Sequence, residues 1–72
     1  MSEIQDKIEN WFVYHPPNEV QLRQYAELRE AGKALATVVA KLCPPGDDRD
    51  AAILKVREAV MLANSSIACG GK

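Results

Sequence analysis

The sequence predicts an all-α protein with a short N-terminal helix followed by a long antiparallel helical hairpin. No run of residues alternates between apolar and polar side chains, as a half-buried strand would. Two proline-containing breaks, "YHPPN" and "CPPGDD", divide the chain into segments in which apolar residues recur at steps of three and four. With 72 residues, the chain is expected to form a single helical-hairpin domain over residues 1–72.

The first expected helix begins at Ser2 and carries one apolar face. Ser2 and Gln5 have the spacing of a capping box, in which each residue bonds the backbone N–H of the other. The apolar face that follows consists of Ile4, Ile8, Trp11 and Phe12. This periodicity predicts that Trp11 and Phe12 belong to the core. Pro16–Pro17 should end the helix, because proline lacks a backbone N–H and disfavours helix in the residue before it.

The two longer helices should form the hairpin. Asn18 and Gln21 make a second capping box, and Asp47 or Asp48 is expected to cap the last helix. The apolar stripes are Leu22, Tyr25, Leu28, Gly32, Leu35, Val39 and Leu42 in one helix, and Ile53, Val56, Val60, Ala63 and Ile67 in the other. Each helix should exceed about 20 residues, or roughly 30 Å. The short connection makes them antiparallel, and the glycines of "CGGK" should end the last helix.

The composition excludes several classes of protein. Nine Lys and Arg residues are scattered among ten Asp and Glu residues, whereas duplex DNA binding needs a basic face. No segment approaches the roughly 18 apolar residues of a membrane span. The acidic, polar start "MSEIQDKIEN" does not resemble a signal peptide, so a cytoplasmic location is expected. One His and two Cys residues, without a CxxC pair, predict neither a metal site nor a cofactor.

Catalysis is not predicted either. The chain has no second His, no pair of carboxylates in an apolar setting and no glycine-rich loop before a helix. His15 and Cys69 could pair as base and nucleophile only if another group oriented the His, and no such group is evident. We therefore expect a binding protein and not an enzyme.

Self-association is expected from the size of the chain. A domain of this length buries only about 60% of its unfolded surface. Small scaffolds usually add disulfides, a metal or oligomerisation, and the first two are not predicted here. The sequence therefore predicts a homo-oligomer.

A candidate ligand site follows from the antiparallel geometry, which places the start of the second helix beside the end of the third. The residues expected at this pole combine an aromatic ring, an imidazole, two cations, an amide and a hydroxyl: Tyr14, His15, Arg29, Lys33, Asn64 and Ser65. Aromatic rings stack on bases, cations hold phosphates, and amides and hydroxyls read base edges. The set predicts a small, flat, anionic ligand.

Other interpretations of the same residues stay open at this point. His15 is equally suited to ending the first helix, and Arg29 and Lys33 have the i, i+4 spacing of a solvated helix face. Asn64 and Ser65 also suit the fraying end of the last helix. The stripes alone are compatible with a helical interaction module that has no nucleotide ligand.

Four segments in order, "NWFVYHPPNE", "RQYAELREAGKALA", "LCP" and "LKVREAVMLANSSIA", resemble the phage anti-CBASS sponge family, which shares its helical hairpin with an anti-Thoeris sponge. The resemblance covers roughly positions 8 to 69. It implies a helical hairpin that assembles into a homohexamer in the cytoplasm of the infected bacterium. It also implies that the protein sequesters the cyclic oligonucleotide messengers of CBASS without cleaving them, so that the effector is not activated.

The resemblance also implies roles for particular residues. Tyr14 would stack on a base of a cyclic dinucleotide such as cGAMP, and Arg29 or Lys33 would contact its phosphates. In the family a basic residue often follows the "A-N-x-x-I-A" run and contacts a cyclic trinucleotide. Here that position is Cys69, with Lys72 the next basic residue, so the chain departs from the trinucleotide pattern.

Overall fold

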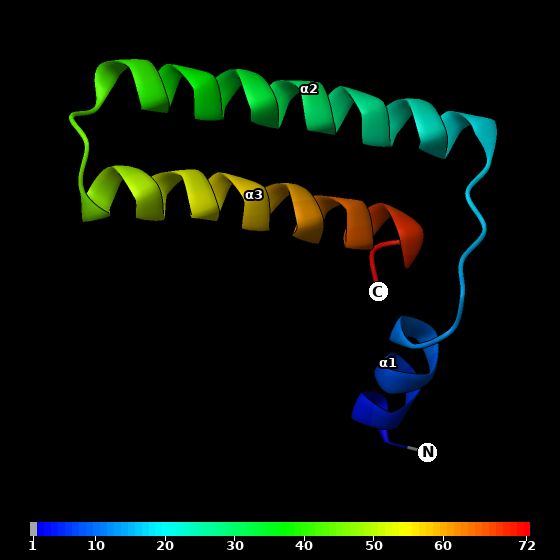
Figure 1. The fold of residues 1–72 in the computed structure, drawn as a ribbon. Coiled ribbons are helices and arrows are strands. Elements are labelled where there is room, and N and C mark those ends of the chain that lie inside the picture. Colours follow the sequence, from blue (N-terminus) through cyan, green and yellow to red (C-terminus); the bar gives the residue numbers. More distant parts are fainter. Residues whose placement is uncertain (1) are drawn as a thin grey trace.

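The computed structural model describes residues 2–72, and within them it confirms the all-α prediction. The helices are α1 (Glu3–Trp11), α2 (Glu19–Leu42) and α3 (Asp47–Ala68), and the described residues contain no strand. Figure 1 shows α2 and α3 side by side and antiparallel, with α1 beyond the open end of the hairpin and close to the C-terminus. The predicted order of a short helix and a long hairpin is therefore confirmed.

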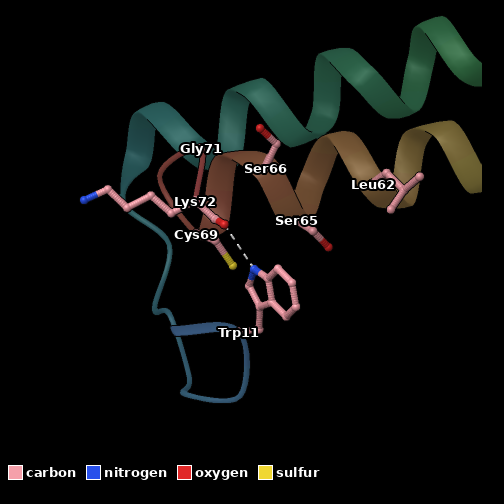
Figure 2. Close-up of a pocket in the computed structure, with 7 residues that line it drawn as sticks. All are labelled: Trp11, Leu62, Ser65, Ser66, Cys69, Gly71 and Lys72. Atoms are coloured by element: carbon pink, nitrogen blue, oxygen red, sulfur yellow. Dashed lines mark hydrogen bonds between the residues drawn. The ribbon is translucent and has the colours of Figure 1, made fainter. Parts of the chain in front are cut away.

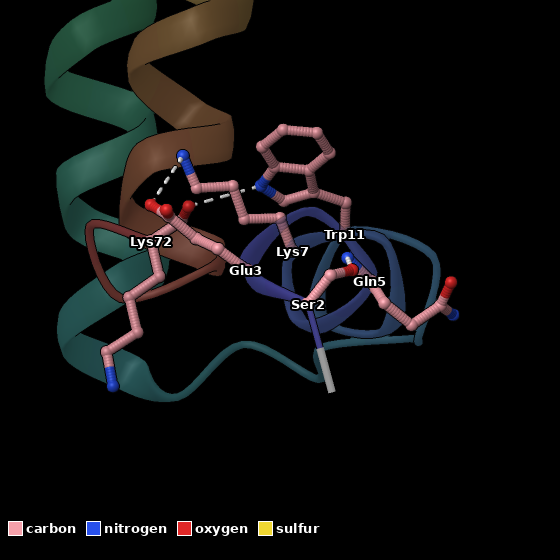
Figure 3. Close-up of polar contacts among 6 residues, drawn as sticks. All are labelled: Ser2, Glu3, Gln5, Lys7, Trp11 and Lys72. Atoms are coloured by element: carbon pink, nitrogen blue, oxygen red, sulfur yellow. Dashed lines mark hydrogen bonds and ion pairs between the residues drawn. The ribbon is translucent and has the colours of Figure 1, made fainter.

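Side-chain caps fix the starts of α1 and α2. At α2 the predicted capping box is complete: the Gln21 N–H donates to Asn18 Oδ1 at 2.8 Å, and the Asn18 N–H donates to Gln21 Oε1 at 3.1 Å. At α1 the Gln5 N–H donates to Ser2 Oγ at 3.1 Å (Figure 3). The Gln5 side-chain amide, however, donates to Glu9 Oε1 at 3.1 Å, one turn further along the helix.

The end of α1 differs from the prediction. The helix ends at Trp11, and Phe12 is its C-cap residue, so Pro16–Pro17 do not mark the end. The residues between this cap and α2 form an extended linker. His15 Nε2 lies 2.7 Å from the Asn10 carbonyl oxygen, one of the acceptors that the last turn leaves without an intrahelical partner. An imidazole cap thus ends α1 before the prolines are reached.

The start of α3 also corrects the prediction. Gly46 is the N-cap residue, and it makes no side-chain cap, so neither Asp47 nor Asp48 is the cap. Both aspartates instead lie in the first turn of the helix together with Asp50. Carboxylates there stabilise the helix through its dipole rather than through a cap hydrogen bond.

The packing between α2 and α3 agrees with the predicted apolar stripe throughout α3, but only in part on α2. All five predicted residues of the α3 stripe are partly buried: Ile53, Val56, Val60, Ala63 and Ile67. On α2, Tyr25, Leu28, Gly32 and Val39 are partly buried, but Leu22, Leu35 and Leu42 are exposed. At the open end of the hairpin, Gln21 Nε2 donates to the Ile67 carbonyl oxygen at 3.5 Å.

No side chain among residues 2–72 is fully buried, and the predicted core role of two aromatics is wrong for a single chain. Trp11 is 48% exposed and Phe12 is 84% exposed. Removing a fully buried aromatic side chain costs about 3–5 kcal/mol, and Trp11→Ala should cost less than this in one chain because Trp11 is about half exposed. In the described part of the chain, the backbone of α1 does not come close to that of α2 or α3. Hydrogen bonds from Asn10 Nδ2 to the Cys69 carbonyl (3.2 Å) and from Trp11 Nε1 to a Lys72 oxygen (3.3 Å) connect it to the hairpin.

None of the described helices has the length and apolar character needed to cross a bilayer. The same residues contain no cluster of His, Cys, Asp or Glu side chains that could hold a metal ion.

Candidate functional site

Tyr14 and His15 lie in the linker between α1 and α2. The Tyr14 side chain is 81% exposed, so most of its ring is accessible in a single chain. His15 is partly buried, and its Nε2 is engaged with the Asn10 carbonyl oxygen. Because a carbonyl oxygen only accepts, Nε2 carries the hydrogen in this contact. Of the interpretations left open for His15, the helix-ending one is the contact that the structure shows.

Arg29 and Lys33 line one groove on a face of the hairpin. Arg57 of α3 lines the same groove from the opposite helix, and its volume is about 260 Å³. The remaining lining is apolar: Gly32, Ala36, Ile53, Val56, Val60 and Met61. No carboxylate lines this groove, and none of the three cations forms a salt bridge within residues 2–72. The groove therefore combines an apolar floor with three unneutralised cations.

Ser65 belongs to a different cavity, at the open end of the hairpin. This cavity measures about 420 Å³ and is lined by Trp11, Leu62, Ser65, Ser66, Cys69, Gly71 and Lys72. In Figure 2 the Trp11 indole lies beside the last turn of α3, and its N–H donates to the Lys72 oxygen. The Ser65 hydroxyl and the Cys69 thiol project on the side of α3 where the indole lies.

Asn64 is held between the helices rather than at a helix end. Gln21 contacts Ile67, and Gly32 lies against Val60, so the antiparallel register places Asn64 about level with Tyr25. The Asn64 Oδ1 atom is buried and has no hydrogen-bond partner within residues 2–72. A buried acceptor left without a partner costs about 1–3 kcal/mol.

One chain thus distributes the six predicted site residues over separate places. Tyr14 and His15 are in the linker, Arg29 and Lys33 in the groove, and Ser65 in the end cavity. The predicted i, i+4 relation of Arg29 and Lys33 on one helix face is consistent with their shared groove. Their common ligand role stays a prediction.

Two residues beside these sites were not selected from the sequence as binding residues. Arg57 could have been found from the register, because the antiparallel pairing that brings Gly32 to Val56 and Val60 also places residue 57 across from Lys33. For Trp11 the apolar stripe of α1 predicts a core position. No signal in the sequence places the Trp11 indole against the C-terminal residues.

Comparison with known proteins identifies the family. No curated protein and no solved structure matches the chain. The family model described as the Acb2/Tad1 hairpin domain matches residues 5–68, from α1 to the last residue of α3. This match confirms the resemblance found in the sequence segments. The chain therefore belongs to the Acb2/Tad1 hairpin-domain family.

Proposed function

We propose that this protein is a phage immune-evasion protein that binds and sequesters cyclic oligonucleotide second messengers, cyclic dinucleotides above all, without cleaving them. Membership of the Acb2/Tad1 family suggests a sponge-type anti-defence protein, and this is the observation that carries the proposal. By holding the messenger in the cytoplasm of the infected host, the protein would keep CBASS effectors from being activated.

The chemistry of the described residues supports this ligand class. The exposed Tyr14 ring offers a stacking platform, which accepts any base because every base has a π-face. Arg29 and Lys33 offer charge-assisted hydrogen bonds to phosphate oxygens. Asn64 and Ser65 supply an amide and a hydroxyl for base edges. Together these groups match a flat anion with several hydrogen-bonding edges.

A second copy of the chain supplies what one chain does not bring together. Tyr14 and the groove lie apart in one protomer, so a site that uses both is best built between protomers. A cyclic dinucleotide is close to twofold symmetric, and a twofold interface presents the same patch twice. The homohexamer implied by the family resemblance would contain such interfaces. Sequestration and assembly are therefore parts of one proposal.

Assembly beyond a dimer is the first expected result. In a single chain the large apolar side chains stay substantially exposed along all three helices, among them Ile4, Leu22, Leu42 and Leu62. Exposed apolar surface of this extent marks an interaction site. Light scattering coupled to size exclusion should give a mass above that of a dimer for this 7.9 kDa chain. A folded monomer at micromolar concentration would contradict the prediction.

The alternative is a helical interaction module without a nucleotide ligand. The same exposed apolar side chains support it, because assembly alone would cover them. The two functions differ in what they require of the cations: a module needs no free cations around an apolar groove. Ligand binding by the pure protein therefore discriminates between them.

The deciding experiment is calorimetry of the pure protein against cyclic di- and trinucleotides. Cyclic dinucleotides should bind, and the matched linear dinucleotides should bind much more weakly because they lose more conformational freedom on binding. Cyclic trinucleotides should bind less well than cyclic dinucleotides, because Cys69 occupies the position where proteins of the family often have a basic residue. Absence of heat with every cyclic ligand would favour the interaction module.

The bound ligand should also be recovered intact. The described residues offer no metal cluster, and His15 Nε2 is engaged with a backbone carbonyl. After denaturation of the complex, chromatography should return the cyclic dinucleotide that was added. Recovery of a linear dinucleotide or a mononucleotide would replace sequestration with hydrolysis.

A further inference from the structure

We propose that Arg57 acts with Arg29 and Lys33 as a third phosphate-binding residue, and that the groove they line holds the phosphate-bearing part of a cyclic dinucleotide. This inference rests on the proposed function and extends it to a residue on the other helix. Arg29 and Lys33 come from consecutive turns of α2, and Arg57 faces the same groove from α3. The ligand would thus be held from both helices of the hairpin.

The state of the three side chains supports a ligand role. Arg29, Lys33 and Arg57 are exposed, and none pairs with a carboxylate within residues 2–72. By contrast, Lys55 and Arg49 of α3 do form ion pairs, with Glu58 and Asp50. Like charges around one groove repel each other, so an anion bound there relieves repulsion as well as forming hydrogen bonds.

The lining of the groove indicates which kind of anion fits. An inorganic ion would use the cations alone and leave the apolar floor of Gly32, Val56, Val60 and Met61 without a partner. A nucleotide carries a charged phosphodiester beside a sugar and a base, so it can satisfy the cations and cover the floor. A cyclic dinucleotide carries two such phosphodiesters.

The size of the groove assigns it to one part of the ligand. Pockets that enclose a whole drug-sized ligand measure about 300–1,000 Å³. The groove of about 260 Å³ lies below that range, so it takes one end of a cyclic dinucleotide. The rest of the ligand would project from the groove, where a linker tyrosine such as Tyr14 of another protomer could stack on a base.

The test compares Arg57→Gln with Lys41→Gln in calorimetry with cyclic GMP–AMP. Both substitutions remove one positive charge from an exposed side chain, but Lys41 lies in the last turn of α2 and outside the groove. Arg57→Gln should bind about tenfold more weakly at low salt, the size of one charge-assisted hydrogen bond, and Lys41→Gln should bind like the wild type. The loss should shrink in about 0.5 M salt, because screening weakens the contact. Arg57→Lys should retain part of the affinity.

A direct readout of the groove comes from Met61. Its methyl group can be ¹³C-labelled, and because the chain has two methionines, a Met61→Leu variant assigns the signal. Cyclic GMP–AMP should shift the Met61 signal in the wild type, and the shift should need more ligand in Arg57→Gln. An unmoved Met61 signal in a protein that binds the ligand would overturn the groove as the site.

The remaining outcomes separate this inference from the proposed function. If the wild type bound neither a cyclic dinucleotide nor a cyclic trinucleotide, the proposed function would fail, and this inference with it. If the wild type bound and Arg57→Gln bound equally well, only the role of Arg57 would fail. If Arg57→Gln lowered the mass of the assembly in light scattering, the groove would instead seat a second copy of the chain, and the phosphate assignment would be overturned.

Discussion

Replacing Tyr14 with alanine is expected to weaken the binding of a cyclic dinucleotide by roughly 1–3 kcal/mol per stacked base, which is about tenfold or more. The fold should not change, because Tyr14 is 81% exposed and lies in the linker beyond the end of α1. Calorimetry should therefore show the loss of affinity, and circular dichroism should show unchanged helix content and an unchanged melting temperature.

The control for this prediction is Tyr14→Phe, which keeps the aromatic face and removes only the hydroxyl group. It should retain most of the affinity if the ring acts by stacking. Arg29→Ala and Lys33→Ala, measured beside it, report on the phosphate contacts, and their losses should be larger at low salt than at high salt. If Tyr14→Ala and both of these variants bound as tightly as the wild type, the linker and the groove would not form the site.

The parts of the fold that sequence analysis predicted correctly depend on local rules. The capping box at Asn18 and Gln21 needs two residues three positions apart, and both of its hydrogen bonds form. The α3 stripe through Val56 and Val60 follows the helical period, and its members face α2. The hairpin itself follows from two long helices and a short connection. The capping box is determined within a few residues of sequence, and the stripe and the hairpin follow from the periodicity and length of single helices.

The features that sequence analysis missed depend on contacts between distant residues or on backbone conformation. Proline rules placed the end of α1 too late, because the His15 ring caps the Asn10 carbonyl from the linker. The helical period put Trp11 in the core, although its indole only reaches the C-terminal residues. Residues predicted to share one pole lie in the linker or line separate cavities, and Arg57 joins the groove only through the register between the helices. Spacing along one helix contains none of this information.

The register between α2 and α3 depends on Gly32. The substitution Gly32→Val is expected to destabilise the hairpin by about 1–3 kcal/mol, the usual cost of overpacking. A Cβ atom at position 32 would lie 2.5 Å from Val60 Cγ2, and valine at position 60 has little rotational freedom with which to move away. The same contact predicts that the coupling between Gly32→Ala and Val60→Ala is favourable, because Val60→Ala removes the methyl group that the new Cβ atom would meet, and a double-mutant cycle of these two substitutions measures it. Ala34→Val, which adds the same branched side chain at an exposed position of α2, is the matched control and should change stability by less than about 1 kcal/mol.

Chemical unfolding followed by circular dichroism measures the stability of all of these variants. It is done at one protein concentration, because assembly shifts apparent stability. Equal stability of Gly32→Val and Ala34→Val would show that α2 and α3 do not approach each other at Gly32, and the groove that contains Arg29, Lys33 and Arg57 would then have a different floor.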